Sequence, residues 1–154
     1  MAEKKSVVDT MNELLVDEFT AINQYLAHRE KLKLLGYKKL ACRLKEHIED
    51  ERDHVHKLMK RILFLGGEPY MSQMKPMNIG KDVKSMLESD KKLETACVKK
   101  YNDAVDQAVA EKDNGTMDVF IHNLCEEESH LRYLMAQLKQ IDEMGIESYL
   151  STIK

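Results

Sequence analysis

The sequence ERDH at residues 51–54 returns as EESH at residues 127–130, and each copy is a Glu-x-x-His inside a long stretch without glycine or proline. Three residues is close to one turn of an α-helix, so the glutamate and the histidine of each copy can point to the same place. A single motif of this kind is weak evidence for a metal site in a charged helical protein. Two copies in one chain are stronger evidence than one.

A second pair of glutamates lies at equal distances before the two Glu-x-x-His motifs. Glu18 lies 33 residues before Glu51, and Glu94 lies 33 residues before Glu127. Each of these upstream glutamates is followed seven residues later by a tyrosine. The whole set therefore repeats with an offset of 76 residues: Glu18, Tyr25, Glu51 and His54 correspond to Glu94, Tyr101, Glu127 and His130.

Glycine and proline divide the rest of the chain into helical stretches, because all eight of these residues fall between or beside the periodic segments. Ser6 is a suitable N-cap for the first helix, with Asp9 three residues later. Asn114-Gly115 is expected to close the third helix. The expected helices cover about residues 6–35, 38–65, 82–112 and 116–144, with a short fifth helix over 146–153.

The lengths of the connections predict how these helices are arranged. Short connections after the first and third helices indicate two antiparallel hairpins, whereas residues 66–81 are long enough to run the length of a bundle. We therefore predict an all-α fold in one domain over residues 1–154. It is an antiparallel four-helix bundle with one long crossover between the second and third helices, the ferritin-like arrangement.

Composition agrees with this fold and excludes several functions. Aromatic residues make up only 6% of the chain and charged residues 33%, which favours long amphipathic helices over sheets. A net charge of −3 gives no electrostatic case for binding nucleic acid or an anionic membrane, and no apolar run approaches a membrane span. Cys42, Cys97 and Cys125 have no C-x-x-C spacing and are expected to be buried or half-buried reduced thiols of a cytoplasmic protein.

The apolar seams place four carboxylates in the expected core. On each of the four long helices, one glutamate occupies a position of the buried stripe: Glu18, Glu51, Glu94 and Glu127. An uncompensated buried carboxylate costs several kcal/mol, and these seams contain no lysine or arginine nearby. Four carboxylates with two imidazoles suit two divalent cations. The ligands are too hard for Cu(I) and lack the thiolates of structural zinc, so iron or manganese is expected.

Other polar residues are given smaller roles. Tyr25 and Tyr101 are placed to hydrogen-bond a ligating carboxylate, although Tyr101 equally fits a core aromatic role. His47 precedes Glu51 by one turn and is placed to touch the outside of the site. His28, His47, His56 and His122 are expected to be surface or partly buried residues, not ligands. Glu126 and Glu128 are assigned no role.

These residues resemble bacterioferritin over essentially the whole chain. The resemblance is carried by the following matches: Glu18, Ala21-Ile22-Asn23-Gln24-Tyr25, Glu51-x-x-His54, Arg61-Ile62-Leu63-Phe64-Leu65, Asn78-Ile79-Gly80, Glu94, Glu127-x-x-His130 and Tyr149-Leu150. It implies a 24-subunit cage that oxidises Fe(II) to Fe(III) with O₂ or H₂O₂ at a di-iron site and stores ferric mineral. By the same resemblance, Glu18 and His54 would hold one iron, Glu94 and His130 the other, and Glu51 and Glu127 would bridge them.

The chain departs from this family at one position. Bacterioferritins carry a methionine after the first bridging glutamate, and it ligates haem b across the subunit two-fold axis. Here that position is Arg52, which cannot be an axial haem ligand. The resemblance therefore implies haem-free shells or co-assembly with a sister subunit that supplies the methionine. Met59 and His56 are less favoured replacements.

Four other functions are compatible with paired Glu-x-x-His helices. A rubrerythrin-like di-iron peroxidase is the first alternative, although such proteins usually add a C-x-x-C module that this chain lacks. A di-manganese catalase or di-iron oxygenase is chemically possible. A non-catalytic shell subunit that carries metal or haem is the alternative from a different class.

Overall fold

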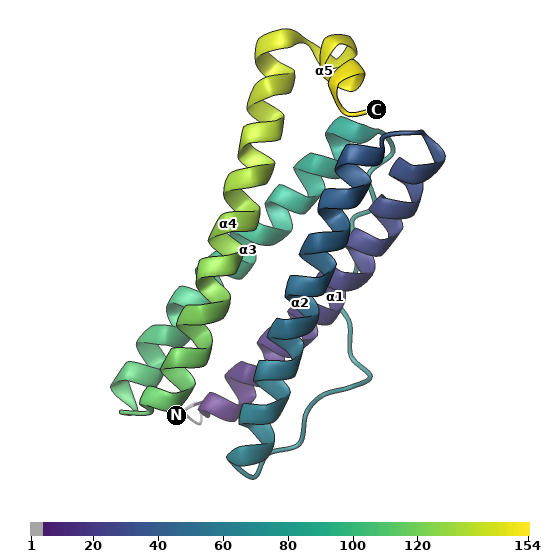
Figure 1. Cartoon of the computed structure of the whole chain (residues 1–154). Helices are drawn as coiled ribbons and strands as arrows, with labels where there is room; N and C mark the ends of the chain where they lie inside the picture. Colours follow the sequence, from purple (N-terminus) through teal and green to yellow (C-terminus); the bar gives the residue numbers. More distant parts are fainter. Residues whose placement is uncertain (1–4) are drawn as a thin grey trace.

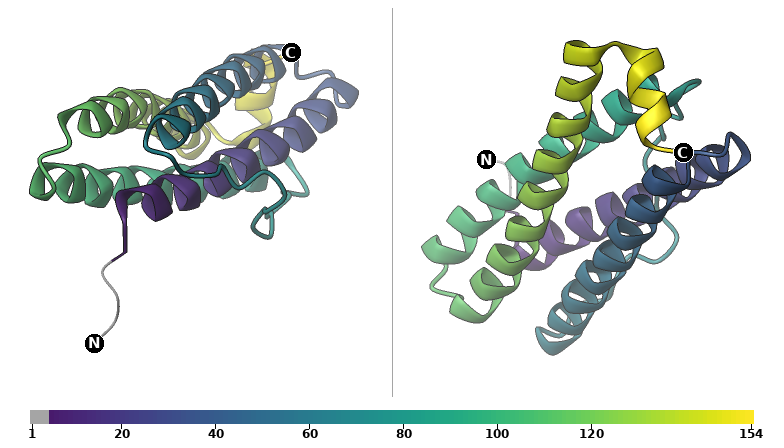
Figure 2. Two further views of the ribbon diagram at one scale, coloured as in Figure 1. Left: turned by 90° about the horizontal axis from the view of Figure 1, so that it is seen from below. Right: turned by 45° about the horizontal axis from the view of Figure 1, so that its top comes forward.

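The computed structural model describes residues 5–154 and has the predicted all-α architecture (Figure 1). Neighbouring helices run antiparallel, with α1 and α3 in one layer and α2 and α4 in the other (Figure 2). A single long crossover, residues 65–82, joins the two hairpins. The helices are α1 (Val7–Leu34), α2 (Lys38–Phe64), α3 (Val83–Ala110), α4 (Asn114–Met144) and α5 (Ile146–Thr152).

Side-chain caps fix where α1 and α4 begin. The Ser6 hydroxyl accepts from the Asp9 backbone N–H at 3.1 Å and the Asp9 carboxylate accepts from the Ser6 N–H, which is the expected first cap completed as a capping box. The expectation that Asn114-Gly115 closes the third helix is wrong. Both residues belong to the first turn of α4, because the Asp113 carboxylate accepts from the Thr116 N–H at 3.0 Å and starts that helix earlier.

The crossover lies along α1 and is held by side chains of that helix. The Asn12 amide accepts from the backbone N–H of Tyr70 at 2.8 Å, and the Thr20 hydroxyl accepts from Lys75 N–H at 3.0 Å. Further along, Gln24 accepts from the Asn78 N–H and His28 Nε2 accepts from the Gly80 N–H. These polar residues satisfy the backbone of a segment that has no secondary structure of its own.

Gly80, at the end of the crossover, is packed against the first turn of α3. An added Cβ at this position would lie 2.3 Å from the Met86 backbone nitrogen. We expect Gly80→Ala to lower the free energy of unfolding by about 1–3 kcal/mol through overpacking, measured by urea denaturation. Gly115→Ala is the control, since the atoms nearest to its added Cβ belong to the guanidinium of Arg61, the end of a long side chain, which can shift more easily than backbone. An equal loss in both variants would contradict this account.

The core is divided into two apolar clusters by a polar layer. One cluster, near α5, includes Leu44, Ile48 and Leu134, and the other, near the start of α1, includes Met11, Leu58 and Phe120. α5 folds over the first cluster, where the buried Tyr149 donates to Gln137 Oε1 at 2.8 Å. The polar layer between the clusters holds the glutamates of the four seams.

Two observations on the surface complete the fold. No helix within residues 5–154 is long and apolar enough to cross a membrane.

All three cysteines are free thiols, but only Cys97 is buried. The expectation that Cys42 and Cys125 are buried or half-buried is wrong, because both lie on the outward faces of α2 and α4.

Candidate metal centre

The six residues predicted as ligands meet in the middle of the bundle. α1 and α3 each supply one glutamate, whereas α2 and α4 each supply a glutamate and a histidine one turn apart. Each of the six is at most 1% exposed: Glu18, Glu51, His54, Glu94, Glu127 and His130. Two sets of four ligand atoms form, each with all its atoms within 4.8 Å of one another, and they share Glu51 and Glu127.

The two shared glutamates each turn one oxygen toward each histidine. Glu51 Oε2 lies 2.8 Å from His54 Nδ1, and its Oε1 lies 3.1 Å from His130 Nδ1. Glu127 Oε1 lies 3.4 Å from His54 Nδ1, and its Oε2 lies 3.7 Å from His130 Nδ1. Of the two histidines, Glu18 contacts His54, at 3.5 Å, and Glu94 contacts His130, at 3.6 Å. The arrangement therefore offers two positions for a metal ion. Each position has one histidine, one terminal glutamate and the two shared glutamates.

The centre contains buried polar atoms that have no hydrogen-bond partner in the described part of the chain. All six residues contribute at least one oxygen or nitrogen without a hydrogen-bond partner, including both oxygens of Glu51 and Glu127 and the inward Nδ1 of both histidines. Buried polar groups in proteins are normally paired. Hard oxygen donors with two imidazoles fit divalent iron or manganese, so this donor set fits two such ions.

When no metal is bound, the raised pKa values of four side chains in the centre favour their protonated forms. Burial, together with the charge of Glu127, raises the pKa of Glu18 and of Glu94 well above the ordinary value. Burial lowers the pKa of His54 and His130, but the surrounding carboxylates outweigh it and raise both pKa values overall. Glu127 is the opposite case. Although burial raises its pKa, the interactions of its carboxylate with Glu94 and with both histidines lower it overall.

The two predicted tyrosines contact the centre across the bundle. The Tyr101 hydroxyl donates to Glu18 and the Tyr25 hydroxyl donates to Glu94. Each tyrosine thus reaches the glutamate of the other helix in the antiparallel α1–α3 pair. The glutamate on its own helix is two turns away, about 10 Å along the axis. These contacts fix one oxygen of each terminal carboxylate.

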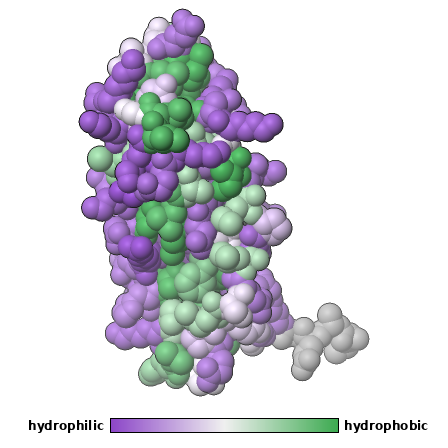
Figure 3. Space-filling view, turned by 90° about the vertical axis from the view of Figure 1, so that its right-hand side faces the viewer, coloured by the Kyte–Doolittle hydropathy of each residue, from purple (hydrophilic) through white to green (hydrophobic). Residues whose placement is uncertain are grey.

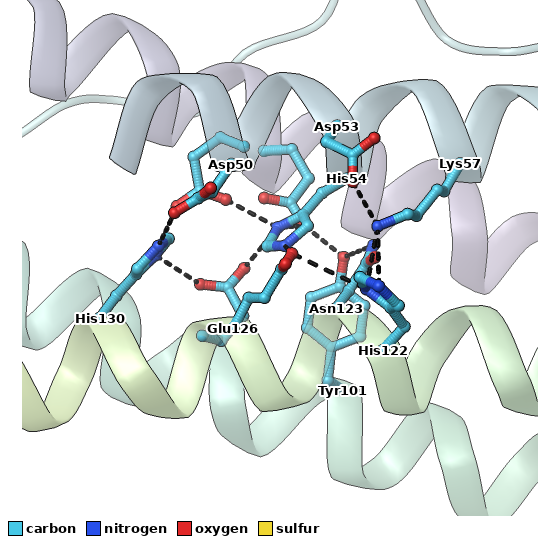
Figure 4. A network of polar contacts seen from close by, with 12 residues as sticks. Asp50, Asp53, His54, Lys57, Tyr101, His122, Asn123, Glu126 and His130 are labelled. Carbon is cyan, nitrogen blue, oxygen red and sulfur yellow. Dashed lines mark hydrogen bonds and ion pairs between the residues drawn. The ribbon is translucent and has the colours of Figure 1, made fainter. Parts of the chain in front are cut away.

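The outer nitrogens of the histidines also have carboxylate partners, which sequence reasoning missed (Figure 4). His54 Nε2 lies 2.7 Å from Glu126 Oε2, and His130 Nε2 lies 3.0 Å from Asp50 Oδ2. The expectation that Glu126 has no role is therefore wrong. A signal was present, because Asp50 and Glu126 each precede a shared glutamate by one residue and are themselves 76 residues apart.

These outer carboxylates orient the histidines and raise their basicity as ligands. We expect Asp50→Ala and Glu126→Ala each to weaken Co(II) binding by about 10- to 100-fold, the usual effect of removing such a partner. Isothermal titration of the metal-free protein measures this. Glu128→Ala, an exposed neighbour of Glu127, is the matched control and should bind as the wild type does. An unchanged affinity in both test variants would exclude the orienting role.

The remaining histidines only partly follow expectation. His56 and His122 are exposed, but His28 and His47 are completely buried, which contradicts their expected exposure. His28 bridges α3 and the crossover, since its Nδ1 lies 2.9 Å from Asp90 and its Nε2 accepts from Gly80. His47 stacks on His130, with ring centroids 4.0 Å apart. Burial, then the neighbouring charge of His130, lowers the pKa of His47 to about 2.

Arg52 lies on the outside of α2. Its guanidinium pairs with Glu49 at 2.8 Å, and the side chain is 56% exposed. A guanidinium is always protonated and has no acceptor lone pair, so this residue does not fit the axial position of a haem. Of the two alternative ligands, His56 is exposed and Met59 packs against the apolar core.

Comparison with known proteins agrees with the geometry. The family model of the ferritin-like domain matches residues 8–144, which include all six residues of the centre. The chain is 35% identical to a bacterial ferritin of Paramagnetospirillum magnetotacticum, over 99% of this chain and 94% of that protein. It is 33% identical to a bacterioferritin of Streptomyces coelicolor, over 96% of this chain and 88% of that protein. It is also 35% identical to a bacterial ferritin of Neisseria gonorrhoeae, over 97% of both.

Proposed function

The chain belongs to the ferritin-like family, as a relative of the bacterioferritins, and we propose that it is an iron-storage subunit with ferroxidase activity. In this proposal Fe(II) is the substrate, O₂ or H₂O₂ is the oxidant, and the ferric product is stored as mineral. Glu18 and His54 bind one iron, Glu94 and His130 bind the other, and Glu51 and Glu127 bridge them.

One observation carries the proposal. Most of the buried side-chain atoms that lack hydrogen-bond partners in residues 5–154 belong to the six residues of the centre, and Glu51 and Glu127 are each shared between two ligand sets. A site for a single structural ion needs neither the second set nor the sharing. Two adjacent positions bridged by carboxylates suit a reaction that takes one electron from each of two metal ions.

The electron balance explains why two positions are useful. Two Fe(II) ions give up one electron each, so O₂ and two protons become H₂O₂, or H₂O₂ and two protons become two water molecules. Either route avoids releasing one-electron oxygen radicals. The negatively charged oxygen ligands favour Fe(III) over Fe(II), because the more highly charged ion gains more from them. The partly exposed Asp50 and Glu126 lie between the centre and solvent on the α2–α4 face.

The proposal includes assembly into a 24-subunit shell. Large apolar side chains lie exposed on the single chain: Leu34 is 88%, Phe64 74% and Met71 60% exposed. Figure 3 shows hydrophobic patches between hydrophilic residues on one face of the molecule. Contacts between subunits would cover such groups. The free thiols suit a reducing compartment, the cytoplasm, and Arg52 suits a shell without haem bound by this chain.

Anaerobic loading with Fe(II), followed by O₂, tests the proposal. We expect a rapid rise in near-ultraviolet ferric absorbance that saturates near two irons per chain, then a slower phase that continues far beyond this ratio. A rapid phase without the slower one would indicate a peroxidase of the rubrerythrin type instead of storage. No rapid phase would overturn the ferroxidase, and strong Soret absorbance would overturn the haem-free shell.

A further inference from the structure

The repeat that builds the metal centre is broken one turn before each shared glutamate. The offset of 76 residues pairs His47 on α2 with Asn123 on α4, and both are completely buried. Asn123 donates from Nδ2 to the Tyr101 hydroxyl at 3.0 Å. His47 meets the corresponding Tyr25 edge to face, with ring centroids 5.6 Å apart. The two halves therefore use these positions differently.

His47 packs on a ligand. Its ring lies 4.0 Å from the His130 ring between centroids, with 18° between the planes. Tyr25 and Tyr133 hold it from the sides, each edge to face at 5.6 Å. His54 has no such neighbour within residues 5–154, where the rings nearest to it are His130 at 6.4 Å and Tyr101 at 6.5 Å. One ligand imidazole is thus covered by a stacked ring, and the other is not.

The nitrogens of His47 do not connect it to the centre. In the described part of the chain both are buried without a hydrogen-bond partner, and neither belongs to a set of ligand atoms that lie within 4.8 Å of one another. His47 is therefore not a seventh ligand in this arrangement. Its contact with the centre is through the flat face of the ring.

Restricting the His130 ring has an energetic consequence. The terminal torsion of histidine is broad and roughly two-fold, so an unsupported ring samples orientations that do not ligate. A ligand held in its binding orientation loses less freedom when the metal binds. Both histidines already have an outer carboxylate, so the stacked ring is the feature that distinguishes His130 from His54.

We propose that His47 is a positioning residue that makes the two metal positions unequal. His47 holds the His130 imidazole in its binding orientation. The Glu94–His130 position therefore binds a metal ion more tightly than the Glu18–His54 position does. This inference rests on the proposed function only in requiring two divalent cations at the centre, and it is independent of whether they are oxidised.

The test compares His47→Phe with His47→Leu in the metal-free full chain. Both variants lack ring nitrogens and fill the same place, but only phenylalanine keeps a flat ring. Co(II) binding is followed by visible absorption, and thermal melting confirms that each variant is folded. In the wild type we expect two Co(II) per chain with unequal affinities. In His47→Leu the tighter step should weaken about tenfold, whereas His47→Phe should stay within about threefold, as expected for one released side chain.

A second step assigns the effect to one position. His47→Leu should weaken Co(II) binding further in a His54→Ala background, where the His130 position remains, but not in a His130→Ala background. Equal losses in His47→Phe and His47→Leu, no loss in either, or a loss that persists without His130 would each overturn the inference. Two Co(II) bound without Fe(II) oxidation would overturn the proposed ferroxidase and leave the inequality of the positions intact.

Discussion

Glu127→Ala should slow the rapid phase of Fe(II) oxidation by at least about 100-fold, because removing even an outer hydrogen-bond partner of a metal ligand costs about 10- to 100-fold. Glu127 contributes to both ligand sets, with Oε1 facing His54 and Oε2 facing His130. Its loss therefore weakens both positions and removes a bridge between them. Glu51→Ala should behave in the same way, since Glu51 is the other shared residue.

The terminal glutamates should give a different result. Glu18 belongs to only one of the two ligand sets, so Glu18→Ala should leave the Glu94–His130 position able to bind metal. We expect this variant to hold about one Co(II) per chain, whereas Glu127→Ala should bind both ions weakly. Co(II) titration and stopped-flow Fe(II) oxidation on the same preparations separate loss of binding from loss of reaction.

The control for this experiment is Glu128→Ala, since this exposed neighbour lies on the same turn of α4. It should oxidise Fe(II) at the wild-type rate. If Glu127→Ala kept the rapid phase at two irons per chain, the centre would not be the place of oxidation. Circular dichroism should show both variants to be folded, since neither substitution removes apolar contacts from the two core clusters.

The fold and the six central residues were predictable because their signals are local. Glu18 and Glu94 stand in apolar stripes with helical spacing, and a charge in such a stripe is conspicuous in the sequence alone. Glycine and proline mark the ends of the helices equally clearly. The repeat then relates the four seams to one another, so the layer at which the glutamates meet follows from helix geometry.

The hydrogen bonds around the centre depend on which helices face each other, and single-helix patterns do not contain that information. Tyr25 reaches Glu94 because α1 and α3 are antiparallel neighbours. Asp50 and Glu126 resemble residues of solvated charged faces, since both remain partly exposed. Only the position of the opposing helix makes each of them a partner of the other helix's histidine.

The burial of His28 was unpredictable for a related reason. α1 has a second face with Asn12, Thr20, Gln24 and His28, which by residue type resembles a solvent-exposed surface. The crossover covers that face, and its backbone N–H groups take these side chains as acceptors. A polar stripe beneath an irregular segment is indistinguishable in sequence from a polar stripe beneath water.

Removing metal should lower the melting temperature by about 8–16 °C at neutral pH. A ligand present at roughly 1,000 times its dissociation constant stabilises the folded state by about 4 kcal/mol, and each kcal/mol shifts the melting temperature of a chain of this size by about 2–4 °C. Here the metal would also coordinate the oxygens and nitrogens of the centre that have no hydrogen-bond partner in residues 5–154. Co(II) is the suitable ion, because it is not oxidised during the measurement.

The difference in melting temperature between the metal-bound and the metal-free protein should widen as the pH rises from about 6 to about 8. The pKa values of Glu18, Glu94, His54 and His130 are raised in the metal-free fold, so these groups hold protons that the unfolded chain releases. Stability from a raised pKa is fully present below the unfolded pKa and is lost as the pH rises through the folded one. Glu127, whose pKa is lowered, contributes the opposite slope, but only as the pH falls below its ordinary value of 4.5.

The affinity for metal rises with pH, whereas the stability of the metal-free protein falls, because each metal ion must displace these protons before it is ligated. The metal-free protein should therefore melt at lower temperature at pH 8 than at pH 6, while the Co(II) form gains affinity over the same range. Calorimetry with a chelator and with Co(II) at both pH values measures the two curves. The Glu51→Ala/Glu127→Ala double variant is the control and should show little dependence on Co(II). A difference that stays constant or narrows with rising pH would mean that the centre is not neutralised by protons when metal is absent.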